Sequence, residues 1–317
     1  LAALRPMTTG KLVVVFGGSG FVGRHVVRAL AKRGYRIRVP CRRPDLAGHL
    51  QPLGKVGQIH AVQANLRYPA SVEAAVRGAG IVINLVGILA EGGAQTFDAV
   101  QAKGAATVAQ AAAAAGARTI HVSAIGADAE SASRYARAKA AGEAAVREAV
   151  PGAIILRPSV VFGPEDDFTN RFASMARMMP VLPLIGGGAT KMQPVYVGDV
   201  AEAVAEAADG HAKAGATYEL GGPEVMTLRE IFAAILDITD RERPLVSLPF
   251  GLARFNAILL QFAPSPLTLT RDQVTLLQND NVVSDAAKAA GLTLEGLGIT
   301  PDSLQAVAPQ YLWRFRP

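Results

Sequence analysis

The sequence predicts an α/β protein built on a Rossmann-type, doubly wound parallel sheet, with a smaller C-terminal α/β region at the carboxyl edge of that sheet. Three observations predict this fold. An apolar run over residues 12–16 leads into a glycine-rich turn and then into an amphipathic helix. Strand-like and helix-like segments then alternate as far as Pro158. Tyr135 and Lys139, four residues apart, follow the fifth strand-like run.

The first predicted strand, residues 12–16, is a short, continuous apolar run, as buried parallel strands are. Glycine or proline ends several of the helices, at Gly34, Gly116 and Pro151. The predicted strands are residues 12–16, 35–40, 59–63, 81–85, 119–123 and 154–157, and the predicted helices are residues 21–33, 71–76, 97–115 and 134–150.

Beyond Pro158 the alternation loosens. Asp199 is expected to be the N-cap of a helix through Ala208, and a capping box at Thr227 opens another through Ile238. We expect residues 11–190 to bind a dinucleotide. Residues 191–317, partly interleaved with the sheet, are expected to close the pocket and contact a partner.

Composition narrows the class of protein. The 317 residues are 50% apolar and carry a net charge of +6, but no run of five basic residues occurs, so nucleic acid ranks low as a partner. No apolar stretch reaches the ~18 residues of a membrane span. The lead before Met7 is too short for a signal peptide. One cysteine, Cys41, allows no internal disulfide. No metal site is expected, because the histidines are scattered: His25, His49, His60, His121 and His211.

The turn after the first strand carries Gly17, Gly20 and Gly23. In dinucleotide-binding proteins such glycines allow the tight turn, the approach of the backbone to a pyrophosphate, and close helix–strand packing. A glycine-rich turn without a ligand is the alternative, but the strand before it and the helix after it favour binding. Ser19, Phe21 and Val22 lie within the same candidate cofactor loop.

The end of the second strand selects between NAD and NADP. An acidic residue there would bind the ribose 2′-hydroxyl, whereas this chain has Arg42 and Arg43. Guanidinium groups bind phosphate with two parallel hydrogen bonds, so the pair predicts NADPH. The alternative is a solvated basic turn.

Ser123, Tyr135 and Lys139 are the candidate catalytic residues. Tyr135 and Lys139 share one face of a helix, and we expect the ammonium to lower the pKa of the phenol, so that it passes a proton to a carbonyl oxygen. Ser123 could hydrogen-bond the same oxygen. The alternatives are that the three residues only hold a cofactor, and that the tyrosine–lysine spacing arises by chance on an exposed helix.

These residues resemble the extended and atypical short-chain dehydrogenases/reductases over roughly residues 11–208. The resemblance implies that further residues contact the cofactor, namely Asn65, Leu66, Leu85, Val86, Gly87, Pro158 and Val161. Asn65 departs from the family pattern, because an aspartate usually stands there. The Leu85–Gly87 turn also replaces a more common alanine-rich one.

Three segments give a narrower likeness, residues 24–27, 193–201 and 269–274. They are similar to the family of NADPH-binding accessory subunits of respiratory complex I and their bacterial homologues. That likeness implies a cofactor held structurally or as a redox sensor. It implies subunits near the quinone module as partners, and a peripheral position on the cytoplasmic face of a bacterial inner membrane or the mitochondrial matrix side. The alternatives are an active NADP(H)-dependent reductase, epimerase or dehydratase, and a cofactor-sensing regulator.

Two C-terminal segments are candidates for contact with a partner. The apolar residues 249–263 carry a helical stripe of Leu252, Phe255, Leu259 and Phe262, which fits an interfacial helix, a partner-binding helix or a core helix. Residues 311–316 place the only tryptophan between aromatic and arginine residues, and we expect this tail to contact a partner rather than its own domain.

Overall fold

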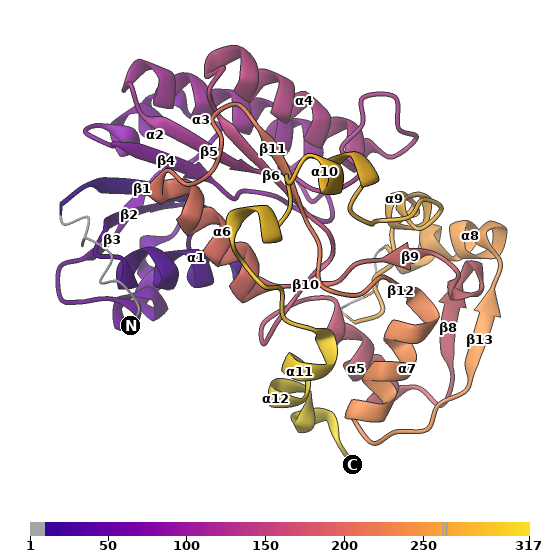
Figure 1. The fold of residues 1–317 in the computed structure, drawn as a ribbon. Coiled ribbons are helices and arrows are strands. Elements are labelled where there is room, and N and C mark those ends of the chain that lie inside the picture. The colour runs from indigo at the N-terminus through magenta and orange to yellow at the C-terminus, as the bar shows by residue number, and fades with distance from the viewer. Residues whose placement is uncertain (1–9, 262, 264–265) are drawn as a thin grey trace. The chain divides into compact units, whose positions relative to one another are not determined.

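A seven-stranded sheet forms the centre of the fold in the computed structural model, which describes residues 10–261, 263 and 266–317 (Figure 1). The strand order is β3-β2-β1-β4-β5-β6-β11, and the pairs β2–β3, β1–β2, β1–β4, β4–β5 and β5–β6 are parallel. The first six strands have the order of a doubly wound dinucleotide-binding fold. The predicted fold class is confirmed. These strands are β1 Leu12–Phe16, β2 Arg36–Cys41, β3 Ile59–Gln63, β4 Ile81–Asn84, β5 Arg118–Val122, β6 Ile154–Pro158 and β11 Thr217–Leu220.

Helices cover both faces of the sheet. Figure 1 shows α2 (Pro69–Val76), α3 (Lys103–Ala114) and α4 (Arg134–Ala149) on one side, with α1 (Phe21–Lys32) and α6 (Val197–Asp209) on the other. Because both faces are covered, the central strand β1 is apolar throughout, and Val13, Val14 and Val15 are fully buried.

An ion-pair cluster joins α1 to α6. The guanidinium of Arg33 pairs with the carboxylates of Glu202, Glu206 and Asp209, the last at 2.5 Å. The phenol of Tyr35 donates to Asp209 at 2.7 Å. These contacts hold α1 against α6. They also pair the guanidinium of Arg33 with carboxylates, and leaving this largely buried charge unpaired would be destabilising.

The chain divides into two compact units that interleave along the sequence. One contains the chain up to Ser123, together with Ala138–Leu156 and Val200–Tyr218; the other contains Ala124–Arg137, Arg157–Asp199 and Glu219–Pro317. The functional division expected at residue 190 stays a prediction.

The second unit is built from short strands and helices around its own core of aromatic and aliphatic side chains. Three two-stranded sheets, β10–β7, β12–β9 and β13–β8, occur among its described residues. Its elements are β7 Val161–Phe162, α5 Thr169–Met178, β8 Leu182–Ile185, β9 Lys191–Met192, β10 Val195–Tyr196, β12 Met226–Thr227, α7 Leu228–Ile238, β13 Leu245–Leu248, α8 Phe250–Leu260, α9 Arg271–Leu276, α10 Asp285–Ala289, α11 Leu304–Val307 and α12 Pro309–Leu312. Short 3₁₀ segments lie at Pro44–Leu53 in the first unit and at Gly186–Gly188, Glu295–Leu297 and Trp313–Phe315 in the second.

Most predicted elements are confirmed, and one cap is wrong. The capping box of Thr227 with Glu230 is present, and α7 ends at Ile238 as predicted. Asp199 is not an N-cap, because α6 already begins at Val197. Its carboxylate instead accepts a hydrogen bond from the backbone N–H of Asp302 at 2.9 Å, which holds the C-terminal segment.

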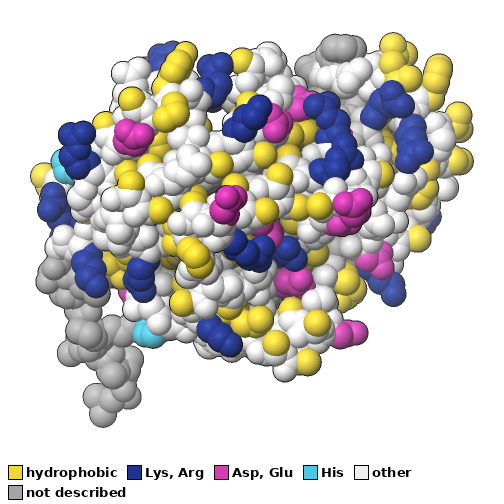
Figure 2. All heavy atoms as spheres, turned by 90° about the horizontal axis from the view of Figure 1, so that it is seen from above, with side chains coloured by type: hydrophobic (Ala, Val, Ile, Leu, Met, Phe, Trp, Pro, Cys, Tyr) yellow, Lys and Arg dark blue, Asp and Glu magenta, His cyan; other side chains and the backbone are white. Residues whose placement is uncertain are grey.

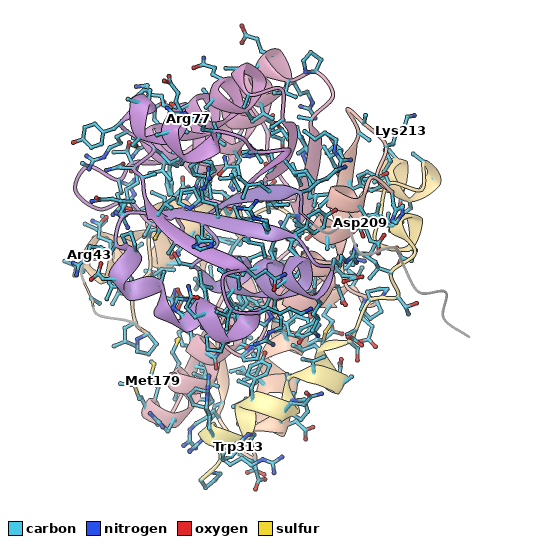
Figure 3. All side chains as sticks on the ribbon, turned by 90° about the vertical axis from the view of Figure 1, so that its left-hand side faces the viewer. Arg43, Arg77, Met179, Asp209, Lys213 and Trp313 are labelled. Carbon is cyan, nitrogen blue, oxygen red and sulfur yellow. The ribbon has the colours of Figure 1, made fainter. Side chains whose placement is uncertain are left out.

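The predicted role of residues 311–316 as a partner-binding tail is wrong for most of the segment. Tyr311, Leu312 and Phe315 are buried in the core of the second unit. Tyr311 bonds Thr169 at 2.8 Å, and Arg314 donates to Asn170 at 2.6 Å. Only Trp313 keeps an exposed aromatic side chain, labelled in Figure 3. The apolar side chains of the tail complete a core, so they are not available to another protein.

Within the described part of the chain, no helix combines the length and hydropathy needed to cross a bilayer. The same residues contain no group of three or more His, Cys, Asp or Glu side chains arranged to hold a metal ion.

Candidate functional site

The glycine loop lies where the strand order reverses, between β1 and β4. At Gly17, which has a φ of +79°, an added Cβ would lie 3.1 Å from the carbonyl carbon of Leu85 and 3.2 Å from the backbone nitrogen of Val86. The structure therefore brings the predicted loop against the predicted turn after β4. In doubly wound sheets this crevice at the carboxyl ends of the strands is where ligands bind.

Gly23 and Gly20, the other two glycines of the loop, have different structural roles. A Cβ at Gly23 would fall 2.0 Å from the Gly17 carbonyl oxygen, so only glycine lets α1 pack this closely on the turn. A Cβ at Gly20 would meet a single atom within 4 Å, the Gly17 oxygen at 3.3 Å. Gly20 is also the N-cap of α1 and has no side-chain cap, and the first turn lacks an acidic residue. No side-chain cap and no acidic residue of the first turn therefore occupy the N-terminus of α1, where the helix dipole is positive. This arrangement fits the binding of a phosphate.

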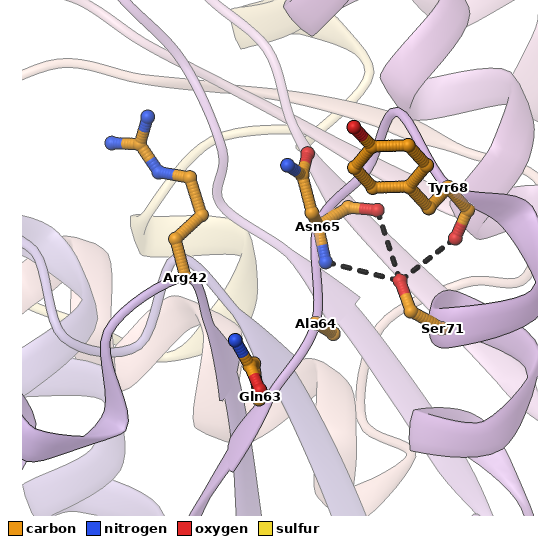
Figure 4. Close-up of a pocket in the computed structure, with 6 residues that line it drawn as sticks. All are labelled: Arg42, Gln63, Ala64, Asn65, Tyr68 and Ser71. Atoms are coloured by element: carbon orange, nitrogen blue, oxygen red, sulfur yellow. Dashed lines mark hydrogen bonds between the residues drawn. The ribbon is translucent and has the colours of Figure 1, made fainter.

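A cavity of about 270 Å³ opens beside the ends of β2 and β3 (Figure 4). It is lined by Arg42, Gln63, Ala64, Asn65, Tyr68 and Ser71. Figure 4 shows the guanidinium of Arg42 extending from one side and the side chains of Asn65 and Tyr68 from the other. Among the described residues Arg42 has no hydrogen-bond or ion-pair partner. The cavity therefore presents a free cation next to an amide and an aromatic ring.

Arg43 differs from its neighbour. Its guanidinium pairs with the carboxylate of Asp45 at 2.7 Å and points outward, as Figure 3 shows. The pairing raises the pKa of Arg43 and lowers the pKa of Asp45. Arg43 does not line the cavity. From the sequence, the two arginines were expected to bind phosphate equally. The structure distinguishes them, because Arg43 is paired with Asp45 and Arg42 is not paired with any residue that the structure describes.

Asn65 lines the far side of the cavity, and Leu66 follows it in the sequence. The Asn65 side-chain oxygen accepts from the backbone N–H of Arg67 at 3.1 Å, while Ser71 bonds the Asn65 backbone. Leu66 packs toward α3, where a Cβ on Gly104 would lie 3.0 Å from its methyl group. Asn65 thus reaches the cavity with a fixed side chain, and Leu66 supports it from the core.

Lys139 is buried next to the turn that follows β4. An added Cβ at Gly87 would lie 3.3 Å from its Nζ, and Nζ donates to the Val122 carbonyl oxygen at 3.4 Å. Burial lowers the pKa of Lys139 to about 8, and the carboxylate of Glu143 partly opposes this shift. Ser123 follows directly after β5; its Oγ is buried and has no partner among the described residues. A buried hydroxyl without a partner fits a group that bonds a ligand.

A buried polar cluster near Lys139 was missed from the sequence. His121 is 2% exposed and lies opposite Asn84 in the β4–β5 register, with a ring nitrogen 3.3 Å from the amide nitrogen. Burial, with the charges of Lys139 and Arg147, lowers the pKa of His121 to about 3, so the ring is neutral. Gln101 lies in a π-helical turn, Asp98–Ala102, and donates to the Ile88 carbonyl. The sequence did contain a signal for His121. It lies two residues before Ser123, so the side chains of both residues lie on the same face of the strand.

Tyr135 lies in the first turn of α4, and its environment contradicts one expectation. The pKa of its phenol is raised to about 12, first by burial and then by the charge of Asp272, rather than lowered by the lysine. Asp272 accepts from the backbone N–H groups of Arg134 and Tyr135 at 2.7 and 3.1 Å, and from Ser133 Oγ at 2.8 Å. A phenol held this strongly in its neutral form is a poor general acid or base near pH 7.

Two other predicted cofactor residues lie at strand ends: Pro158 at the end of β6 in the central sheet, and Val161 at the start of the short strand β7. Pro158 ends β6, and its carbonyl accepts from the backbone N–H of Ile125 at 3.0 Å. Val161 pairs with Val195 between β7 and β10. These contacts of Pro158 and Val161 are with residues of the second unit. The roles of both residues in cofactor binding stay predictions.

The fold and the glycine loop define a class, and comparison with known proteins gives the family. The chain belongs to the NAD dependent epimerase/dehydratase family, whose model matches residues 13–221. This confirms the resemblance drawn from the motifs and indicates a nicotinamide dinucleotide as the class of cofactor.

Full-length relatives are more specific. The chain is 37% identical to the mitochondrial NADH dehydrogenase [ubiquinone] 1 alpha subcomplex subunit 9 of Arabidopsis thaliana, over 98% of this chain and 80% of that protein. It is 34% identical to the subunit of the same name from Mus musculus, over 98% and 82% of the two chains. The narrower likeness predicted from three short segments is confirmed.

Two other similarities are looser. A ceramide reductase of Caulobacter vibrioides is 37% identical over 190 residues, 60% of this chain and 58% of that protein. The crystal structure of an NADPH-dependent quinone oxidoreductase from Escherichia coli, complexed with NADPH, superimposes with a TM-score of 0.72 over 95% and 99% of the chains. At 20% identity this last match shows the fold alone.

Proposed function

We propose that the chain is an NADPH-binding accessory subunit of respiratory complex I. The similarity to the subunit 9 proteins over nearly the whole chain carries the proposal. Its partners are then the other subunits of the complex, near the quinone module. Its place is peripheral, on the cytoplasmic face of a bacterial inner membrane or the equivalent matrix side of a mitochondrion.

The residues of the first unit fit NADPH on structural grounds. The Gly17–Gly23 loop leaves open backbone at the N-terminus of α1 for the pyrophosphate, and a Cβ at Gly20 would intrude there. Arg42 is an unpaired guanidinium at the cavity where the 2′-phosphate of the adenosine half would be bound. Asn65 faces the same cavity and would bind the adenine.

The remaining site residues would hold the nicotinamide half. Lys139, beside Gly87, supplies a buried ammonium for the ribose hydroxyls, and Ser123 Oγ supplies a buried hydroxyl without another partner. In the first unit, Ser19, Phe21, Val22, Leu85 and Val86 would contribute mainly backbone contacts. Bound NADPH supplies a hydride, but the raised pKa of Tyr135 disfavours the proton transfer that carbonyl reduction needs. A structural or redox-sensing cofactor is the better account.

The second candidate is an active NADP(H)-dependent reductase. The partial match to a ceramide reductase and the presence of Ser123, Tyr135 and Lys139 favour it. The test is to complement a deletion strain with Tyr135→Phe, which keeps the ring and removes the proton-transfer group. The accessory role predicts a fully assembled complex with unchanged quinone-linked NADH oxidation. Loss of a separate cellular reaction while the complex stays whole would support the reductase instead.

A further inference from the structure

Helix α8 exposes its large apolar side chains and buries its small ones. Ala253 and Ala257, four residues apart, are fully buried against Val274 of α9. The opposite face carries four exposed large side chains: Leu252 at 57%, Phe255 at 66%, Ile258 at 44% and Leu259 at 72%. A helix on the surface of a water-soluble unit normally has the reverse arrangement.

The strand that precedes α8 also exposes an apolar side chain. Val246 of β13 is 53% exposed, and β13 leads directly into α8 through Pro249. Figure 2 shows hydrophobic and basic side chains side by side at the right-hand end of the view, where Figure 1 places α8. Phe262, which extended this stripe in the sequence, lies outside the described residues. A contiguous exposed apolar patch of this kind marks an interaction surface.

The segment that carries this face has charge of one sign. From Arg243 to Arg271 the sequence contains no Asp or Glu, and its only charged residues are three arginines. Arg254, on α8, donates to the neutral side chain of Gln278 at 2.9 Å. Arg271 is exposed at the start of α9. Among the described residues neither guanidinium is paired with a carboxylate, and the neighbouring Asp272 is engaged at the N-terminus of α4.

We propose that this face of α8, with Val246, lies in the headgroup region of an anionic lipid bilayer, with Arg254 and Arg271 on lipid phosphates. At 11 residues, α8 is too short to span a bilayer but suits a helix lying in the interface. Exposed apolar side chains in a segment whose only charged residues are arginines match an anionic surface. The inference deepens the peripheral position in the proposed function, but its argument does not depend on complex I.

The experiment measures co-flotation of the purified full chain with two kinds of vesicle, phosphatidylcholine alone and phosphatidylcholine mixed with phosphatidylglycerol. The wild type should float with the anionic vesicles and be released by high salt. The double variant Leu252→Ser/Phe255→Ser should lower the partition coefficient by at least about tenfold. Arg254→Gln should weaken binding to anionic vesicles and reduce its salt dependence.

Trp313→Ser is the matched control, because Trp313 is 63% exposed but lies outside the patch. It should float as the wild type does. Circular dichroism should show that all variants are folded. The inference is overturned if the wild type ignores both vesicles, or if the double variant and the wild type float equally. It is also overturned if the wild type is a dimer that the double variant dissolves without any vesicle binding, since a second copy then covers the face. Vesicle binding without assembly into complex I would leave this inference standing and sink the proposed function.

Discussion

Asp272 accepts a hydrogen bond from the backbone N–H of Tyr135 at 3.1 Å and thereby closes the N-terminus of the helix that carries the candidate catalytic pair. Ser133 is the N-cap of α4: its Oγ accepts from the Ala136 N–H at 3.2 Å and donates to Asp272. The carboxylate also lies at the positive end of the helix dipole. Residues 269–274, which resemble the accessory-subunit family, thus contain the carboxylate that fixes the position of Tyr135.

We expect Asp272→Asn to lower the free energy of unfolding by about 1 kcal/mol and to lower the pKa of Tyr135 only part of the way from about 12, because burial is the larger cause of the shift and remains in the variant. The native pKa exceeds that of the unfolded chain, so this phenol stabilises the fold below pH ~10, and the contribution is lost as the pH rises through about 12. Ultraviolet titration of the tyrosines, with Tyr135→Phe subtracted, measures the shift. An unchanged titration would show that Asp272 does not act on the phenol.

Arg42→Ala should weaken NADPH binding by about 10- to 100-fold and leave NADH binding unchanged, because one charge-assisted contact contributes about 1.5–3 kcal/mol. Arg43→Ala should cost less than about fivefold, since Arg43 is paired with Asp45. Fluorescence titration of both cofactors checks this. Equal losses from the two variants, or equal wild-type affinities for NADPH and NADH, would refute the assignment of Arg42.

Two glycine substitutions should separate the ligand site from the fold. Gly20→Val should abolish cofactor retention yet leave the melting temperature of the cofactor-free protein nearly unchanged, because its Cβ meets only one atom of the protein. Gly23→Ala should destabilise the apo protein itself, because its Cβ would lie 2.0 Å from the Gly17 oxygen. The checks are cofactor content after purification and thermal melts. Retained cofactor in Gly20→Val would exclude the loop as the phosphate site.

Neighbouring residues of the C-terminal segment should respond oppositely to truncation. Leu312 is fully buried, and Leu312→Ala should cost about 2–5 kcal/mol of unfolding free energy. Trp313→Ala should change it by less than about 0.5 kcal/mol, since the ring is exposed. Urea unfolding of both variants decides the matter. A stable Leu312→Ala protein would mean that the segment does not complete the core.

The first half of the fold could be read from the sequence because its signals are local. The run Leu12–Phe16 and the run Ile59–Gln63 are strands with the predicted bounds. The first of them can be recognised without distant information, because a parallel strand covered on both faces is apolar throughout. The second lies at the edge of the sheet and carries His60 and Gln63 among its apolar residues. The seventh strand, Thr217–Leu220, was not predicted. Its four residues alternate between half-buried and buried positions, and it joins the sheet from far along the chain.

The second unit and the electrostatics of the site could not be read in the same way. Val161 pairs with Val195, and Leu182 pairs with Leu245, so these strands depend on contacts between distant segments. The pKa of Tyr135 is raised first by burial and then by Asp272, which is remote in sequence, whereas the spacing to Lys139 suggested the opposite shift. Likewise, only the structure distinguishes Arg42 from Arg43. The sequence motifs therefore located the site, but its electrostatics depend on residues that only the structure brings close to it.

The most direct test of the accessory-subunit account is native mass spectrometry of respiratory complexes purified through an affinity tag on this chain. The account predicts the chain within an assembly containing the other complex I subunits, with one bound NADPH that is absent from Gly20→Val preparations. A free chain or homodimer that carries no complex I subunit, and that oxidises NADPH with an added carbonyl substrate, would contradict it.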